Sequence, residues 1–140
     1  MELTTFGAVM GFAAEIIGGS LGIYKAAAQR AESPALRDLM EALIREQGKN
    51  LSLMEQARRE NVTEMILEPI AGLHREDFGC EVVFPDGADD AAMKRLAVVL
   101  EKREEKFFRE AAAKMPLPEV ARLFKRVAGK KQKSLEALGA

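Results

Sequence analysis

The most constraining feature of the sequence is a pattern of apolar residues that occurs twice, 84 positions apart. The segment 34–54 has apolar residues at steps of three, four and eight, which places them on one face of an α-helix. The same pattern returns without a gap in the segment 118–138. The matched pairs are Leu36 and Val120, Met40 and Phe124, Leu43 and Val127, Leu51 and Leu135, and Met54 and Leu138. The sequence therefore predicts two long helices that share one pattern.

Each of these helices also has two polar residues on its apolar face. They are Gln47 and Asn50 in the first segment, and Lys131 and Ser134 in the second. The same offset relates the segments that precede the two helices. We therefore expect a duplicated helical hairpin, with a polar pair facing inward in each copy.

Capping signals define four expected helices, at about 5–30, 34–61, 90–115 and 118–138. Thr4 or Thr5, Ser33, and Asp89 or Asp90 are suited to cap the first three helices. Proline at position 34 and again at position 118 fits the first residue of a helix.

The connection between the two hairpins, at about 62–88, is long for a pair of helices. Its first part could form a short helix that breaks at Pro69, and its second part is extended at most, with a Pro-Asp-Gly turn. Two short turns and one long crossover are typical of a ferritin-like four-helix bundle. The fold class expected for residues 1–140 is a single all-α domain of this kind.

Composition narrows the classes of partner. Net charge is −1, from 21 basic and 22 acidic residues, so we expect no nucleic-acid partner. The single cysteine, Cys80, fits a reducing cytoplasm. The segment 6–24 is mostly apolar, but it contains Glu15 and five glycines, so we expect a buried helix and no membrane partner.

At this point the chain resembles the rubrerythrin branch of the ferritin-like superfamily, over nearly its whole length. In that family the first helix of each hairpin supplies a glutamate seven residues before an aromatic residue. The second helix supplies Glu-x-x-His. Tyr24 and Phe108 match the two aromatic positions. The resemblance implies a site for two iron ions that reduces peroxide or activates oxygen.

The six ligand positions that the resemblance implies are mostly occupied by residues unsuited to iron. They are Ile17, Gln47, Asn50, Glu101, Lys131 and Ser134. Glu101 is the one carboxylate among them, while Glu15 and Glu46 point elsewhere by helical phase. A di-iron site needs several anionic oxygen donors and imidazoles. We therefore expect no metal and no cofactor at these positions.

Three functions remain open on the sequence. The first is a non-catalytic relative of the rubrerythrins that acts through assembly or ligand binding. The second is an oxidoreductase or metal-binding protein that uses iron at Glu101 and at other acids. The third is a small-molecule pocket, of unknown ligand, in the emptied centre of the bundle.

Glu101 and Lys131 are expected to pair inside the bundle, because an isolated buried charge costs several kcal/mol. Gln47, Asn50 and Ser134 could supply the remaining hydrogen bonds. The alternative is that the Lys131 side chain extends to the end of the bundle and meets water.

Four glycines form a stripe on the far face of the first helix: Gly7, Gly11, Gly18 and Gly22. Each costs about 1 kcal/mol relative to alanine, so another backbone is expected to come close. We expect it to belong to a second copy of the chain, in a two-fold homodimer through this helix. The alternative is that residues 65–73 of the crossover cover the stripe. Phe12, Ile16 and Ile23 are expected to flank the stripe with exposed apolar surface.

His74 and Cys80 in the crossover could be read as a metal or redox site. The sequence lacks four ligands at a recognised spacing, which favours an ordinary surface loop.

Overall fold

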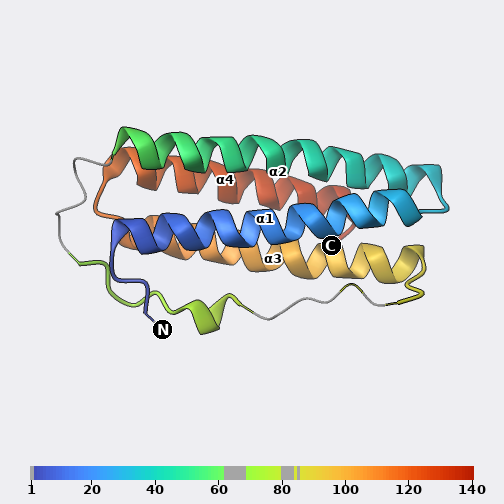
Figure 1. The fold of residues 1–140 in the computed structure, drawn as a ribbon, viewed down its shortest axis with the longest axis horizontal. Helices are drawn as coiled ribbons and strands as arrows, with labels where there is room; N and C mark the ends of the chain where they lie inside the picture. The colour runs from blue at the N-terminus through green and yellow to red at the C-terminus, as the bar shows by residue number, and fades with distance from the viewer. Residues whose placement is uncertain (1, 62–68, 80–83, 85) are drawn as a thin grey trace.

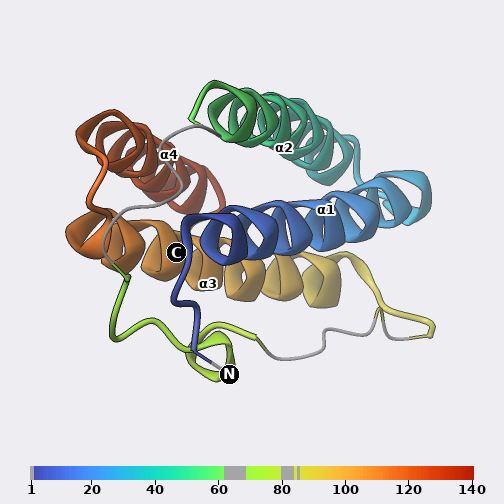
Figure 2. The same ribbon diagram turned by 60° about the vertical axis from the view of Figure 1, so that its left-hand side comes forward.

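The computed structural model describes residues 2–61, 69–79, 84 and 86–140 as a bundle of long helices (Figure 1). The helices are α1 (Phe6–Arg30), α2 (Pro34–Glu60), α3 (Asp90–Lys114) and α4 (Pro118–Ala137), with a short 3₁₀ helix, η2, at Arg75–Asp77. α1 packs along α2 and α3 packs along α4, so two helical hairpins lie against each other (Figure 2). The predicted all-α bundle and its four long helices are confirmed.

The helix starts follow the capping residues seen in the sequence. Thr5 Oγ1 accepts a hydrogen bond from the Ala8 N–H at 3.0 Å, and Asp89 Oδ1 accepts one from the Ala92 N–H at 2.8 Å. Ser33 caps α2 in the same way. Asp90, the first residue of α3, also accepts hydrogen bonds from the backbone N–H groups of residues 32 and 33. The start of α3 is therefore tied to the α1–α2 turn.

Residues 69–74 of the crossover lie beside the N-terminal residues 2–4. The Leu3 N–H donates to the Leu73 carbonyl at 2.7 Å, and the Ile70 N–H donates to the Thr4 carbonyl at 2.9 Å. Gly87 takes a positive φ of 70° in the predicted turn. The possible short helix broken at Pro69 has its first part outside the described residues, and residues 69–74 are not helical. The expected extended segment falls mostly outside the described residues, and η2 was not predicted.

The apolar core has two parts. The larger is built around aromatic rings: Phe107 lies 5.1 Å from Phe12, 5.3 Å from Phe78 and 5.2 Å from Phe108, between ring centroids. The smaller is mainly aliphatic and includes Met40, Leu100 and other residues at the opposite end of the helices. Phe12 and Ile16 belong to the aromatic part and are buried. The prediction that they leave apolar surface exposed was wrong, because the ring of Phe78 from the crossover covers Phe12.

α1 is long and apolar enough to span a membrane by length and composition alone. The buried core helix of a protein outside a membrane can have the same length and composition. In the structure, one face of α1 is buried among the other helices and carries ten buried residues.

Candidate functional site

A group of buried polar residues separates the two apolar parts of the core. On each helix these residues come between those of the aromatic part and those of the aliphatic part. We call the group the polar layer; its members are Ser20, Tyr24, Gln47, Asn50, Glu101, Glu104 and Lys131. All four helices contribute to it.

Lys131 lies at the centre of the polar layer, and its side chain is only 1% exposed. Its Nζ donates to Glu101 Oε2 at 2.9 Å and to Gln47 Oε1 at 2.7 Å, and lies 3.3 Å from Glu104 Oε1. The predicted pair between Glu101 and Lys131 is confirmed. The alternative, in which the lysine extends to water, is wrong.

Glu104 is a second buried carboxylate, and it contacts both hairpins. Its Oε1 accepts a hydrogen bond from Gln47 Nε2 at 2.8 Å, and its Oε2 accepts one from the Ser20 hydroxyl. Arg103 approaches from the edge of the layer, with its Nη2 3.9 Å from Glu104 Oε2 and 3.4 Å from Ser20 Oγ. Its side chain is 13% exposed. The two carboxylates are thus offset by Lys131 inside the layer and by Arg103 at its edge.

Glu101 and Tyr24 form the other side of the layer. The Tyr24 hydroxyl donates to Glu101 Oε2 at 2.6 Å. Burial raises the pKa of Glu101, and Lys131 opposes the shift. Burial and the nearby carboxylates of Glu101 and Glu104 raise the pKa of Tyr24 well above its ordinary value. Both groups therefore hold their protons more tightly than in water.

Two oxygen atoms of the layer have no hydrogen-bond partner among the described residues. They are Glu101 Oε1 and Asn50 Oδ1. The Asn50 amide instead donates to Gln47 Oε1 at 3.1 Å. Buried polar atoms are usually paired, so these two acceptors are the least satisfied positions of the site.

The residues of the layer fit a metal centre poorly. Over the described ranges, no group of three or more His, Cys, Asp or Glu side chains could hold a metal ion. Two carboxylates are present without an imidazole, and the Lys131 ammonium lies between them. A cation there repels a second cation and supplies no lone pair while it is protonated.

Four of the six positions taken from the family pattern meet in the polar layer: Gln47, Asn50, Glu101 and Lys131. Ile17 is buried in the aromatic part of the core and makes apolar contacts. Ser134, expected to bond within the layer, instead lines a groove between α2 and α4. Its placement was therefore predicted wrongly.

The two acids expected to point away from the layer do so. Glu15 is exposed and pairs with Arg75 at 2.7 Å. Glu46 pairs with Lys130 at 3.6 Å. Both findings confirm the phase argument made from the sequence.

Sequence reasoning missed Ser20, Glu104 and the hydroxyl of Tyr24. A signal for the first two was present, because Ser20 and Glu104 are 84 positions apart, as are Gln47 and Lys131. Both pairs are in direct contact in the structure. The offset relates Ser20 and Glu104 to each other, but it does not by itself mark either of them as buried.

The glycine stripe of α1 is open along most of its length. A Cβ atom added at Gly11, Gly18 or Gly22 would meet nothing within 4 Å in the described part of the chain. Residues 69–73 of the crossover bond to residues 3 and 4 instead. Gly7 is half-buried, and residues 65–68 lie outside the described part.

His74 is exposed and forms an isolated bridge with Glu2, just before η2. Cys80 lies outside the described residues, so the possible site that combines the two remains a prediction.

No protein-family model, curated protein or solved structure matches this chain. The resemblance to rubrerythrins therefore rests on the residues quoted above.

Proposed function

We propose that the protein is a non-catalytic, rubrerythrin-type ferritin-like protein in which the polar layer replaces the di-iron site. On this proposal it acts through assembly or ligand binding. The observation that carries the proposal is the position of Lys131 Nζ, 2.9 Å and 3.3 Å from two buried carboxylates. A protein cation occupies the place where the family pattern would put iron.

The proposed origin of this arrangement is an internal duplication of one helical hairpin. It is supported by the two contacts between residues 84 positions apart, Ser20 with Glu104 and Gln47 with Lys131. When two copies pack around a two-fold axis, equivalent residues near the axis touch each other. Both contacts have this property.

Metal analysis tests the proposal. Protein purified without chelators and then incubated with Fe²⁺ should retain close to no iron, measured by elemental analysis after desalting. The variant Lys131→Glu with Gln47→Glu places four carboxylates in the layer and should gain iron binding. Lys130→Glu, one residue away and outside the layer, is the matched control and should stay iron-free. About two iron atoms per wild-type chain would overturn the proposal.

A rubrerythrin-like oxidoreductase or metal-binding protein is the second candidate, and Glu104 favours it. This acid was not expected in the layer, and it shares Lys131 with Glu101, whose Oε1 has no hydrogen-bond partner among the described residues. Iron bound by the wild-type protein and lost in Glu104→Gln would support this candidate. Iron absent from both would exclude it.

The assembly we propose is a homodimer through the glycine stripe of α1. Mid-helix glycines cost about 1 kcal/mol each, and nothing in the described chain uses the space above Gly11, Gly18 and Gly22. Of the flanking apolar residues, Ile23 remains half-buried. Gly18→Leu should fold, because no described atom lies within 4 Å of the added Cβ, and should shift a dimer to a monomer in sedimentation experiments. Gly129→Leu on α4 is the control; a wild-type monomer would refute the dimer.

A further inference from the structure

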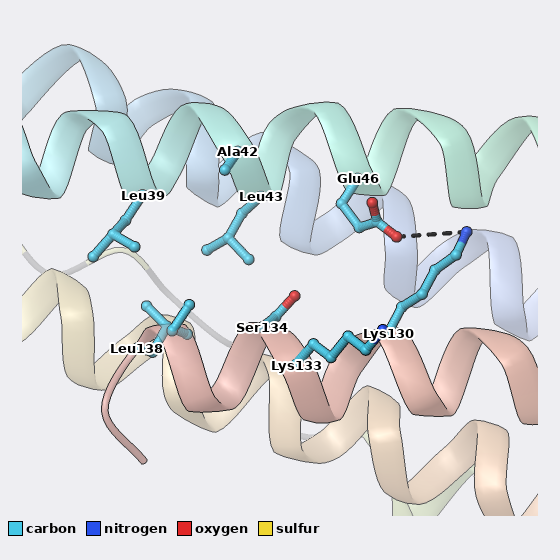
Figure 3. A pocket seen from close by; sticks show the side chains of 9 residues that line it. Leu39, Ala42, Leu43, Glu46, Lys130, Lys133, Ser134 and Leu138 are labelled. Atoms are coloured by element: carbon cyan, nitrogen blue, oxygen red, sulfur yellow. Dashed lines mark ion pairs between the residues drawn. The ribbon is translucent and has the colours of Figure 1, made fainter.

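The outer surface between α2 and α4 contains a hollow of about 280 Å³ (Figure 3). Leu39 and Leu43 point into it from α2, and Leu138 points into it from α4 (Figure 3). Glu46 and Lys130 line one end and form an ion pair at 3.6 Å there. Lys133 and Ser134 also line the hollow. Its apolar part is formed by the three leucines together with Ala42 and Ala137.

A second, shallower hollow continues from Lys130 along the same two helices. It is lined by Arg45, Gly48, Lys49, Ser52, Leu53, Gln56, Arg126 and Lys130. No acidic residue is among the described residues that line it. The two hollows share Lys130 as a lining residue, so they lie next to each other along one groove, an apolar hollow and a basic hollow with the Glu46–Lys130 ion pair between them.

Three cations at the basic end have no ion pair within the described part of the chain: Arg45, Lys49 and Arg126. Lys130 is already paired with Glu46. This local excess of positive side chains is not apparent from the net charge of the whole chain, which is −1. The groove is thus complementary to an anion of more than one charge.

Gly48 widens the basic end. It lies in the middle of α2, where glycine is less favourable than alanine. An added Cβ would meet nothing within 4 Å in the described chain. The missing side chain therefore leaves space that the protein itself does not fill.

We propose that this groove binds a single-chain amphiphile that carries a phosphate group. The phosphate lies against Arg45, Lys49 and Arg126, since arginine forms paired hydrogen bonds with phosphate oxygens and a phosphate monoester has a charge close to −2. The chain lies between Leu39, Leu43 and Leu138. At about 280 Å³ the apolar hollow is near the lower limit of small-molecule sites, roughly 300 Å³, which favours one short chain.

This inference rests on the ligand-binding part of the proposed function and gives it a site. None of the groove residues belongs to the polar layer. Metal analysis tests the layer and ligand titration tests the groove, so a failure of either proposal can be recognised separately.

Calorimetric titration with n-octyl phosphate, below its micelle concentration, tests the groove. Wild-type protein should bind it, and inorganic phosphate and n-octanol should each bind at least about tenfold more weakly, because each satisfies one end only. Arg45→Gln with Arg126→Gln should weaken octyl phosphate binding by about tenfold or more. Arg58→Gln with Arg59→Gln makes the same charge change on exposed residues of α2 and should leave binding unchanged.

Gly48→Leu supplies an independent test that changes no charge. It should fold, by circular dichroism, and should lose octyl phosphate binding, because the leucine fills the groove. Gly18→Leu on α1 is its control and should bind like wild type.

Three results would overturn the proposal. Equal affinity for inorganic phosphate and octyl phosphate would show that the apolar end is unused. If the protein co-sediments with anionic phospholipid vesicles but does not bind octyl phosphate, the groove is a membrane-binding surface. Tighter binding of a single-stranded oligonucleotide, lost in Arg45→Gln with Arg126→Gln, would assign it to nucleic acid.

Discussion

The two hairpins of the bundle contribute differently to the polar layer. The α1–α2 hairpin supplies neutral groups, and the α3–α4 hairpin supplies charged groups. The neutral residues are Ser20, Tyr24, Gln47 and Asn50, and the charged ones are Glu101, Glu104 and Lys131, with Arg103 at the edge. The opposite charges are therefore paired within one hairpin, while the other hairpin supplies hydrogen bonds.

The neutral groups of the first hairpin help to offset the desolvation cost of the charged groups of the second. A buried ion pair recovers its desolvation cost only when further hydrogen bonds satisfy the remaining atoms. The Gln47 side chain accepts a hydrogen bond from Lys131 and donates one to Glu104. Tyr24 donates to Glu101, and Ser20 donates to Glu104. Docking of the first hairpin thus completes the environment that the charges of the second hairpin require.

The largest expected effect comes from removing the central charge. Lys131→Met should lower the free energy of unfolding by about 3–5 kcal/mol, because it leaves two buried carboxylates without their cation. Urea unfolding measures this loss. Adding Glu101→Gln should restore only part of the stability, since Glu104 remains, and adding Glu104→Gln as well should restore more.

Lys130→Met is the matched control for this substitution. Lys130 is the neighbouring residue, partly exposed and paired with Glu46, so its loss should cost at most about 1 kcal/mol. A Lys131→Met protein as stable as wild type would mean that the charges of the second hairpin do not depend on each other.

A smaller effect is expected on the neutral side. Gln47→Leu should destabilise by about 1–3 kcal/mol, because Glu104, Lys131 and Asn50 each lose a hydrogen-bond partner. Gln56→Leu, on the exposed face of the same helix, should change stability by about 0.5 kcal/mol or less. If Gln47→Leu proved more damaging than Lys131→Met, the contrast between the hairpins would be reversed.

The smallest effect concerns Tyr24 and appears mainly at high pH. Tyr24 is the single tyrosine, and the chain has no tryptophan, so its ultraviolet absorbance reports one hydroxyl. The pKa of this hydroxyl is raised in the folded state, so folded protein holds the proton more tightly than unfolded protein. Stability should therefore fall as pH rises above the ordinary tyrosine value of 10.0 and through the raised pKa.

Tyr24→Phe removes this pH-dependent part and, near neutral pH, should cost about 1.5 kcal/mol through the lost hydrogen bond to Glu101. An absorbance titration with a midpoint at the ordinary value, in protein that is still folded, would contradict the burial of the hydroxyl.

Much of the fold could be predicted from the sequence because local signals and long-range packing agree. Three helices begin directly after the capping residues expected from the sequence, which are Thr5, Ser33 and Asp89. The bounds of the four helices differ from the expected ones by one residue at most. The path of the crossover was less predictable. Phe78 of the crossover packs in the aromatic part of the core. The residues around it show no helical or strand periodicity of apolar residues, so the local sequence does not predict its burial.

The polar layer could be predicted only in part. Glu101 and Lys131 were expected to pair inside because both occupy ligand positions of the rubrerythrin pattern and an isolated buried charge is costly. Glu104 follows Lys102 and Arg103 in a charged run, which is typical of a solvated face, so its burial was not apparent. The prediction for Ser134 was wrong for a different reason. The family pattern placed its side chain in the polar layer, but the side chain lines the groove between α2 and α4. The local sequence does not distinguish these two positions.

The polar layer also determines how far each helix can slide along its neighbours. A slide of α4 by one turn, about 5.4 Å, would replace Lys131 by Val127 or Leu135 at the centre of the bundle. Glu101 and Glu104 would then face an alkyl group, at a cost of several kcal/mol. Apolar packing alone tolerates such slides far better, since leucine and valine can exchange contacts with little loss. The buried lysine therefore fixes the axial position of α4 relative to the other helices.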